Sequence, residues 1–155
     1  MNANRKAMLD AIAWAEGTAG LGDNGYNVVV GGTLFYDYSD HPRQHVYIPR
    51  YKLYSTAAGR YQLLERYFDH YRKLLNLPDF SPASQDAIAI QQIKERRALH
   101  DIDAGRFEAA IVKVRNLWAS LPGAGYRQSE RKLDDLRQVY LDAGGDLDTG
   151  ELIHG

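Results

Sequence analysis

Glu16 is the residue of this sequence whose type and position most favour chemistry. It ends a stretch, residues 4–16, in which apolar side chains recur at the i, i+3, i+4, i+7 spacing of a helix with one buried face. Gly17 can take the left-handed conformation that ends a helix, which would leave Glu16 at the negative pole of the helix dipole, beside Trp14. Such surroundings raise the pKa of a carboxyl group. A carboxyl group protonated near neutrality could be the general acid that cleaves a glycosidic bond, although a solvated glutamate at a helix end is the alternative.

A second candidate is the segment Ser-Thr-Ala-Ala-Gly-Arg-Tyr-Gln at residues 55–62. Ser55 or the threonine after it is expected to cap a helix here, which puts a glycine early in that helix at a cost of about 1 kcal/mol relative to alanine. The close approach of another group would explain this glycine. Tyr61 and Gln62 could donate hydrogen bonds to a sugar ring or orient a carboxylate, and an ordinary packed helix start is the alternative.

A third candidate is Leu-Pro-Gly-Ala-Gly-Tyr at residues 121–126, which breaks the helical pattern before it. Its two glycines could bring the backbone and the hydroxyl of Tyr126 against a ligand. The segment could equally be a plain connection between two helices.

Four possible metal ligands lie close together in the sequence, at Asp37, Asp40, His41 and His45. Their order matches no metal-binding signature, and Asp-His-Pro at residues 40–42 is typical of a turn with local hydrogen bonds. We therefore expect no metal and no other cofactor, and we assign Asp40 and His41 to the lining of a binding cleft.

The composition is that of a soluble globular protein of one domain. The chain has 155 residues, of which 45% are hydrophobic and 25% charged. With 19 basic against 20 acidic residues the net charge is −1, which argues against nucleic acid as a partner. The absence of cysteine excludes disulfides and thiolate sites. Neither a signal peptide nor an apolar run of ~18 residues is apparent, so we expect a cytosolic chain without stable membrane association.

The elements that position these residues are mostly helical. The patterns predict helices over residues 4–16, 56–75, 82–97, 107–118 and 129–143, a glycine-turn hairpin over 28–36 and a short strand over 45–48. The predicted fold is of the α+β class: a mainly helical single domain over residues 1–145 with a small antiparallel sheet near the N-terminus. Residues 146–155 are expected to form a flexible tail.

Three segments, in this order along the chain, resemble the lambda-type phage endolysins. They are Trp-Ala-Glu-Gly-Thr at 14–18, Gly-Arg-Tyr-Gln-Leu-Leu at 59–64 and Trp-Ala-Ser-Leu-Pro-Gly-Ala-Gly-Tyr at 118–126. Shorter matches lie between them, and the likeness ends after residue 145. Each motif alone is weak, but their shared order along nearly the whole chain makes the resemblance specific.

The resemblance implies a lysozyme-like fold and a lytic transglycosylase that cuts the glycan strands of bacterial peptidoglycan. In that family the glutamate at the position of Glu16 is the single catalytic acid and base. It protonates the oxygen between N-acetylmuramic acid and N-acetylglucosamine, and then takes the proton of the muramic C6 hydroxyl, which closes a 1,6-anhydro ring. Tyr61 and Gln62 stand where the family's Tyr-Gln pair lines the cleft, and Tyr126 stands where a tyrosine would face the glutamate.

Ser55, Asp40 and His41 complete the residues that we expect to bind substrate. Asn27 stands where the resemblance to the lambda-type endolysins leads us to expect an aspartate, which removes one candidate for a second catalytic carboxylate. The open alternatives are a hydrolytic muramidase with Asp37 or Asp40 as base and a non-catalytic peptidoglycan-binding module. An amidase or peptidase is disfavoured for want of a ligand set.

The expected partner is the peptidoglycan glycan strand, bound by a monomer. The resemblance implies that the protein waits in the host cytoplasm until a holin releases it to the cell wall.

Overall fold

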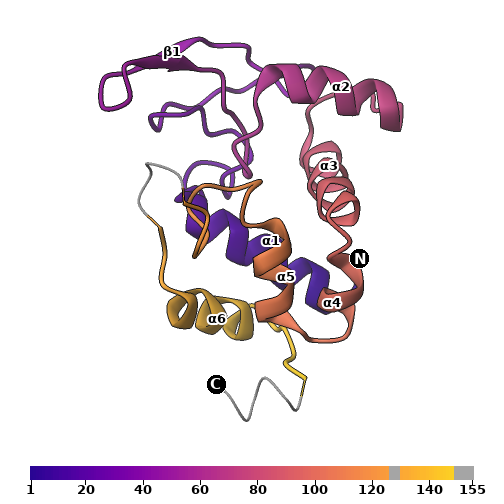
Figure 1. Ribbon diagram of the computed structural model, residues 1–155. Coiled ribbons are helices and arrows are strands. Elements are labelled where there is room, and N and C mark those ends of the chain that lie inside the picture. The colour runs from indigo at the N-terminus through magenta and orange to yellow at the C-terminus, as the bar shows by residue number, and fades with distance from the viewer. Residues whose placement is uncertain (126–129, 149–155) are drawn as a thin grey trace. The chain divides into compact units, whose positions relative to one another are not determined.

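The computed structural model describes residues 1–125 and 130–148, which fall into two compact units (Figure 1). One unit combines Met1–Gly17 with the described residues from Ala89 onward, and the other is Thr18–Ile88. The helices and strands are α1 (Ala3–Glu16), β1 (Val46–Ile48), β2 (Leu53–Ser55), α2 (Glu65–Leu75), α3 (Pro82–Glu95), α4 (Leu99–Asp103), α5 (Phe107–Val114) and α6 (Leu133–Asp142). This is the α+β class predicted from sequence, mainly helical with a small antiparallel sheet.

Helix α1 is the centre of the first unit, since both α4 and α6 pack against it. Asn2 caps its N-terminus by accepting a hydrogen bond from the backbone N–H of Arg5 at 2.9 Å. Seven of its 14 residues are buried, and four of these are alanines. Because the distance between packed helices depends on the side chains at their contact, these alanines allow close approach.

The chain after α6 is tied to the first unit through residue 148. The backbone N–H of Asp146 donates to Asn4 Oδ1 at 2.9 Å, and the hydroxyl of Tyr140 donates to the Asp146 carbonyl at 2.8 Å. The N–H of Asp148 donates to the Gly105 carbonyl at 3.0 Å. Over residues 146–148 the predicted flexible tail is therefore anchored, and residues 149–155 lie outside the described part.

The second unit has an aromatic core. The rings of Phe68 and Phe80 pack edge-on with centroids 5.0 Å apart, and Phe35 stacks on Phe80 at 6.0 Å. The sheet of this unit pairs β1 with β2 in antiparallel register, so that Tyr47 stands opposite Tyr54. Strand β1 confirms the predicted strand at residues 45–48, whereas β2 was not predicted.

Residues 28–36 form the predicted antiparallel glycine turn, but its arms share a single bridge, between Val28 and Leu34, and are not regular strands. The first arm also pairs with a distant segment. Val29 bridges to Ala58, and the N–H of Val30 donates to the Ala57 carbonyl at 3.0 Å. The two arms are joined by hydrogen bonds from the Val29 N–H to the Thr33 carbonyl at 2.7 Å and from the Phe35 N–H to the Asn27 carbonyl at 2.9 Å.

The predicted helix over residues 56–75 begins only at Glu65, and its first nine residues form an irregular loop instead. Ala58 makes isolated bridges to Val29 and to Leu63, and Gly59 and Gln62 have φ of 84° and 53°. Those positive φ values are incompatible with a right-handed helix. Gly59 is thus explained by close approach, because a side chain there would collide with Gln85.

The other predicted helices are present in the structure, but their lengths differ from the predicted lengths. Helix α3 starts at the predicted Ser81-Pro82 pair, where Ser81 Oγ accepts a hydrogen bond from the Ser84 N–H at 3.4 Å. Helix α5 ends at Val114, four residues before its predicted end. After it the backbone forms isolated turns, in which the N–H of Leu117 donates to the Val114 carbonyl at 2.9 Å and that of Leu121 to the Trp118 carbonyl at 3.1 Å. Helix α6 occupies the core of the predicted 129–143 helix, and α4 was not predicted.

Replacing Gly59 with alanine should destabilise the protein by more than about 3 kcal/mol, because strain at positive φ adds to a collision with Gln85 and with the Phe80 ring. The matched control is Gly20→Ala, since Gly20 has φ of 81° and nothing lies within 4 Å of the point that a Cβ would occupy. That variant should lose only about 1–2 kcal/mol. Urea unfolding followed by circular dichroism measures both, and equal losses would show that the collision is relieved without cost.

Candidate active site

Glu16 is the last residue of α1, and its carboxyl group stands at the C-terminal end of the helix. Gly17 has φ of 81°, and its backbone N–H donates to the carbonyls of Ala13 and Trp14, so the helix ends in the predicted way. The last turn of α1 contains no basic residue. Within the helix, nothing therefore offsets the unfavourable placement of a negative charge at this end.

Burial raises the pKa of Glu16 to about 7. The hydroxyl of Ser120 donates a hydrogen bond to Glu16 Oε1 at 3.0 Å, which favours the ionised form and acts in the opposite direction. Within residues 1–125 and 130–148, no charged side chain contributes to the shift. A carboxyl group with this pKa is present in both forms near neutrality and can give up a proton and take one back.

Ser120 is a site residue that reasoning from the sequence missed. It lies 104 residues from Glu16, in the non-helical segment after α5, and no spacing rule links the two positions. Sequence reasoning selected the glycines and Tyr126 of the same stretch for their backbone freedom and aromatic ring. Tyr126 itself lies outside the described residues.

Tyr61 belongs to the second unit, where its side chain is buried. Its hydroxyl donates to Asp86 Oδ1 at 2.6 Å, and the hydroxyl of Tyr26 donates to the same oxygen at 2.9 Å. The Arg60 guanidinium lies over both rings, 5.3 Å from that of Tyr26 and 5.8 Å from that of Tyr61. Burial and then the charge of Asp86 raise the pKa of the Tyr61 phenol. Of the two roles considered for Tyr61, this geometry fits the orientation of a carboxylate, and Asp86 is a further residue that the sequence did not reveal.

Gln62 and Ser55 both use their side chains to support nearby backbone. The side-chain amide of Gln62 donates to the Gly59 carbonyl at 2.9 Å and to the Val28 carbonyl at 3.3 Å. Ser55 Oγ accepts from the N–H of Ala57 at 3.2 Å. Both side chains are half-buried, and both hold the irregular loop before α2.

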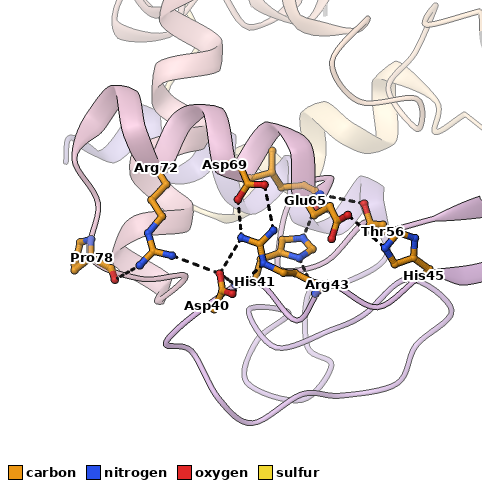
Figure 2. A network of polar contacts seen from close by, with 10 residues as sticks. Asp40, His41, Arg43, His45, Thr56, Glu65, Asp69, Arg72 and Pro78 are labelled. Carbon is orange, nitrogen blue, oxygen red and sulfur yellow. Dashed lines mark hydrogen bonds and ion pairs between the residues drawn. The ribbon is translucent and has the colours of Figure 1, made fainter.

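Asp40 belongs to a network of ion pairs that joins the loop around residue 41 to α2 (Figure 2). Arg43 Nε lies 2.9 Å from Asp40 Oδ2, and the same guanidinium lies 2.6 Å from Asp69 Oδ1. Arg72 reaches Asp40 from α2 at 3.5 Å. The hydrogen bonds from Arg43 hold the pKa of Asp40 below its usual value. Asp40 is therefore an ionised structural partner, and its carboxylate is already occupied by cations.

His41 is buried and packs against the aromatic core, with its ring 4.9 Å from that of Phe80. Its Nδ1 accepts a hydrogen bond from the Arg43 N–H at 3.0 Å, so Nε2 donates to the Leu63 carbonyl at 2.9 Å in the neutral ring. Burial lowers the pKa of His41 and favours this neutral form. The prediction that His41 lines a cleft is not supported, because both ring nitrogens are bonded within the protein.

The remaining polar candidates also have local partners. Asp37 accepts from the Ser39 N–H at 2.9 Å, and this bond holds the pKa of Asp37 low. Asn27 Oδ1 accepts from the Asp23 N–H at 2.8 Å, a bond that an aspartate could equally accept. Across the described ranges, no group of three or more histidine, aspartate and glutamate side chains is placed to hold a metal ion.

A sequence profile for endolysins matches residues 6–147. The chain belongs to the endolysin family. This endolysin is 57% identical over 149 residues to the endolysin of Escherichia phage lambda, with 94% of each chain covered. It is 52% identical over 155 residues to the endolysin of Escherichia phage P2, with 92% of this chain and 93% of the relative covered.

The fold of this endolysin is that of a lysozyme, as predicted. It superimposes on bacteriophage lambda lysozyme complexed with a chitohexasaccharide with a TM-score of 0.92, at 56% identity over 96% of this chain and 98% of the other. A second structure of lysozyme from bacteriophage lambda gives a TM-score of 0.88 at 55% identity, with the same shares covered. Among the described helices, none is both long and apolar enough to cross a membrane.

Replacing Glu16 with glutamine should stabilise this endolysin at pH 8. The pKa of Glu16 is about 7 in the folded chain against an ordinary value of 4.5, so the folded state binds the proton more tightly. The contribution of Glu16 to stability is therefore fully present below pH 4.5, falls between pH 4.5 and 7, and stays reduced above pH 7 by up to about 3 kcal/mol.

Urea unfolding at several pH values tests this expectation. The gain of Glu16→Gln over the wild type should be near zero below pH 4.5 and should reach its full size above pH 7. The control Glu95→Gln removes an exposed carboxylate that accepts from Gln91 at 3.2 Å, and should show no such gain. A gain that did not change with pH would mean that ionised Glu16 is not disfavoured.

Proposed function

We propose that this endolysin is a lytic transglycosylase that cleaves the β-1,4 bond between N-acetylmuramic acid and N-acetylglucosamine in bacterial peptidoglycan. Glu16 is its single acid and base. The observation that carries the proposal is the environment of Glu16, whose pKa is about 7 through burial, with Ser120 as the hydrogen-bond partner. The lambda lysozyme to which the chain is similar has been solved with a chitohexasaccharide, which supports a glycan as substrate.

The reaction needs one group that first gives up a proton and then accepts one. Protonated Glu16 transfers its proton to the oxygen that joins the muramic C1 to the next sugar, and that bond breaks. The Glu16 carboxylate then takes the proton of the muramic C6 hydroxyl while O6 bonds to C1. The product is a 1,6-anhydro end, the enzyme regains its starting form, and no water is used. The attacking hydroxyl belongs to the same sugar, so its effective concentration is high.

Hydrolysis by an inverting route would need a second carboxylate as general base. The two aspartates considered from sequence are poor bases, because hydrogen bonds hold the pKa of Asp37 and of Asp40 low. Asp40 is also paired with Arg43 and Arg72. These contacts favour the transglycosylase over the hydrolase.

Glu16→Gln should abolish lysis of purified sacculi while binding to them stays within about twofold, since glutamine keeps the size of the side chain and loses the transferable proton. Glu95→Gln is the matched control and should keep full activity. Mass spectrometry of wild-type digests should show 1,6-anhydro-muramic ends. Reducing ends would identify a hydrolase, and unchanged lysis by the glutamine variant would remove Glu16 from the chemistry.

The pH profile of kcat/KM should fall above about pH 7, because the free enzyme must begin with Glu16 protonated. Below that pH the profile should stay flat as far as the protein remains folded, because no second catalytic group has to be ionised. Initial rates on solubilised glycan strands between about pH 4.5 and 9 measure this. A bell-shaped profile with an acid limb near about pH 4 would indicate an aspartate base.

A further inference from the structure

The Ser120 hydroxyl that donates to Glu16 lies outside any helix or strand. Helix α5 ends at Val114, and residues 115–125 contain turns but no repeating backbone hydrogen-bond pattern. A donor that must stay 3.0 Å from Oε1 needs another support, because a hydrogen bond weakens steeply with distance and angle. Two residues just before α6, Glu130 and Arg131, make the contacts that supply it.

Arg131 touches both Ser120 and the end of α1. Its backbone N–H donates to the Ser120 carbonyl at 2.8 Å. Its Nε lies 3.4 Å from the Ala15 carbonyl, and its guanidinium lies 4.8 Å from the centre of the Trp14 ring. The Ala15 carbonyl is among the last four of the helix, which have no partner inside it, and a cation is favoured there. Arg131 thus supplies from a distant part of the chain the charge that the last turn of α1 lacks.

Glu130 holds the residues that follow Ser120. Its Oε1 accepts from the N–H of Gly123 at 3.0 Å and its Oε2 accepts from the N–H of Gly125 at 2.9 Å. Both oxygens are used, so the carboxylate fixes the direction of two peptide groups at once. Arg115 lies beside the same turn, since a Cβ on Gly123 would stand 2.7 Å from its guanidinium.

We propose that Glu130 and Arg131 form a clamp that positions Ser120 against Glu16. The proposal rests on the proposed function, because Ser120 is the hydrogen-bond partner of the carboxyl group that is proposed to be catalytic. Arg131 contacts both Ser120 and the end of α1, and Glu130 fixes the turn after Ser120 by accepting two of its backbone hydrogen bonds. Both residues act through Ser120 and the turn that follows it, so both are positioning residues.

The test compares Ser120→Ala, Arg131→Ala and the double variant of the full chain. The pKa of Glu16 is read by carbon-13 NMR titration, and kcat and KM are measured on solubilised glycan strands. Ser120→Ala should raise the pKa of Glu16, because the lost hydrogen bond favoured the ionised form. Arg131→Ala should raise it in the same direction and lower kcat about tenfold, with KM within about twofold.

The double variant decides between positioning and simple loss of charge. If Arg131 acts through Ser120, the double variant has the same pKa for Glu16 and the same kcat as Ser120→Ala. Additive changes would overturn the proposal, because they would show that Arg131 acts on Glu16 independently. Unchanged pKa and kcat in Arg131→Ala would overturn it as well.

Further variants keep the test decisive if Arg131→Ala is unstable. Glu130→Gln retains size but offers one acceptor oxygen instead of two, and should raise the pKa of Glu16 by less than Ser120→Ala does. Lys132→Ala removes a neighbouring cation whose side chain makes no cap hydrogen bond, and should change neither quantity. Wild-type digests with reducing ends would refute the transglycosylase yet leave the NMR comparison valid, so the two failures are distinguishable.

Discussion

The constraint on which the first unit depends is a carboxyl group partly removed from water at the wrong end of a helix dipole. Among the described residues no charged side chain contributes to the pKa of Glu16, and burial keeps that pKa near 7. This arrangement lowers stability at neutral pH, and it persists only because the surrounding structure is fixed by other contacts. Helix α1 is packed against α4 and α6, and Gly17 ends the helix directly after Glu16. A rigid helix thus keeps in place a group that would be more stable in solvent.

The second unit solves a different problem, which is how to hold a chain with little regular structure. Its sheet has two strands of three residues each, so most backbone groups need other partners. Gln85 shows the solution. Its side chain accepts from the Arg60 N–H at 2.9 Å and donates to the carbonyls of Tyr26 and Phe80 at 3.0 and 2.9 Å. Side chains that look like substrate ligands in the sequence, such as His41 and Gln62, are used in the same way.

A structural feature could be predicted from the sequence where it depends on residues that are close together in the chain. The end of α1 at Glu16 and the start of α3 at Ser81 follow from local rules, since cap, glycine and periodicity lie within a few residues. The loop at residues 56–64 could not be predicted, because its conformation is set by Gln85 and by bridges to residue 29. The contact of Ser120 with Glu16 could not be predicted for the same reason.

The roles of polar residues could not be assigned from the sequence where those residues are buried in the folded chain. His41 resembles a ligand in the sequence, but its surroundings in the folded chain are the rings of Phe68 and Phe80. The resemblance to phage endolysins gave the family and the fold correctly, since both depend on many positions at once. It did not indicate which polar side chains bond to the backbone of the protein, because that can be known only from their hydrogen-bond partners in the folded chain.

The contact between Ser120 and Glu16 has a property that follows from hydroxyl chemistry. A serine hydroxyl carries one hydrogen and two lone pairs, and rotation about its C–O bond can present either. The Ser120 hydroxyl donates to the Glu16 carboxylate in the 3.0 Å contact. When the carboxyl group is protonated, the hydroxyl can rotate and accept a hydrogen bond from it. The same pair of oxygens therefore stays bonded while the proton leaves and returns, and only the direction of the bond reverses. An ammonium or guanidinium group, which can only donate, would stabilise one protonation state alone and would oppose the return of the proton.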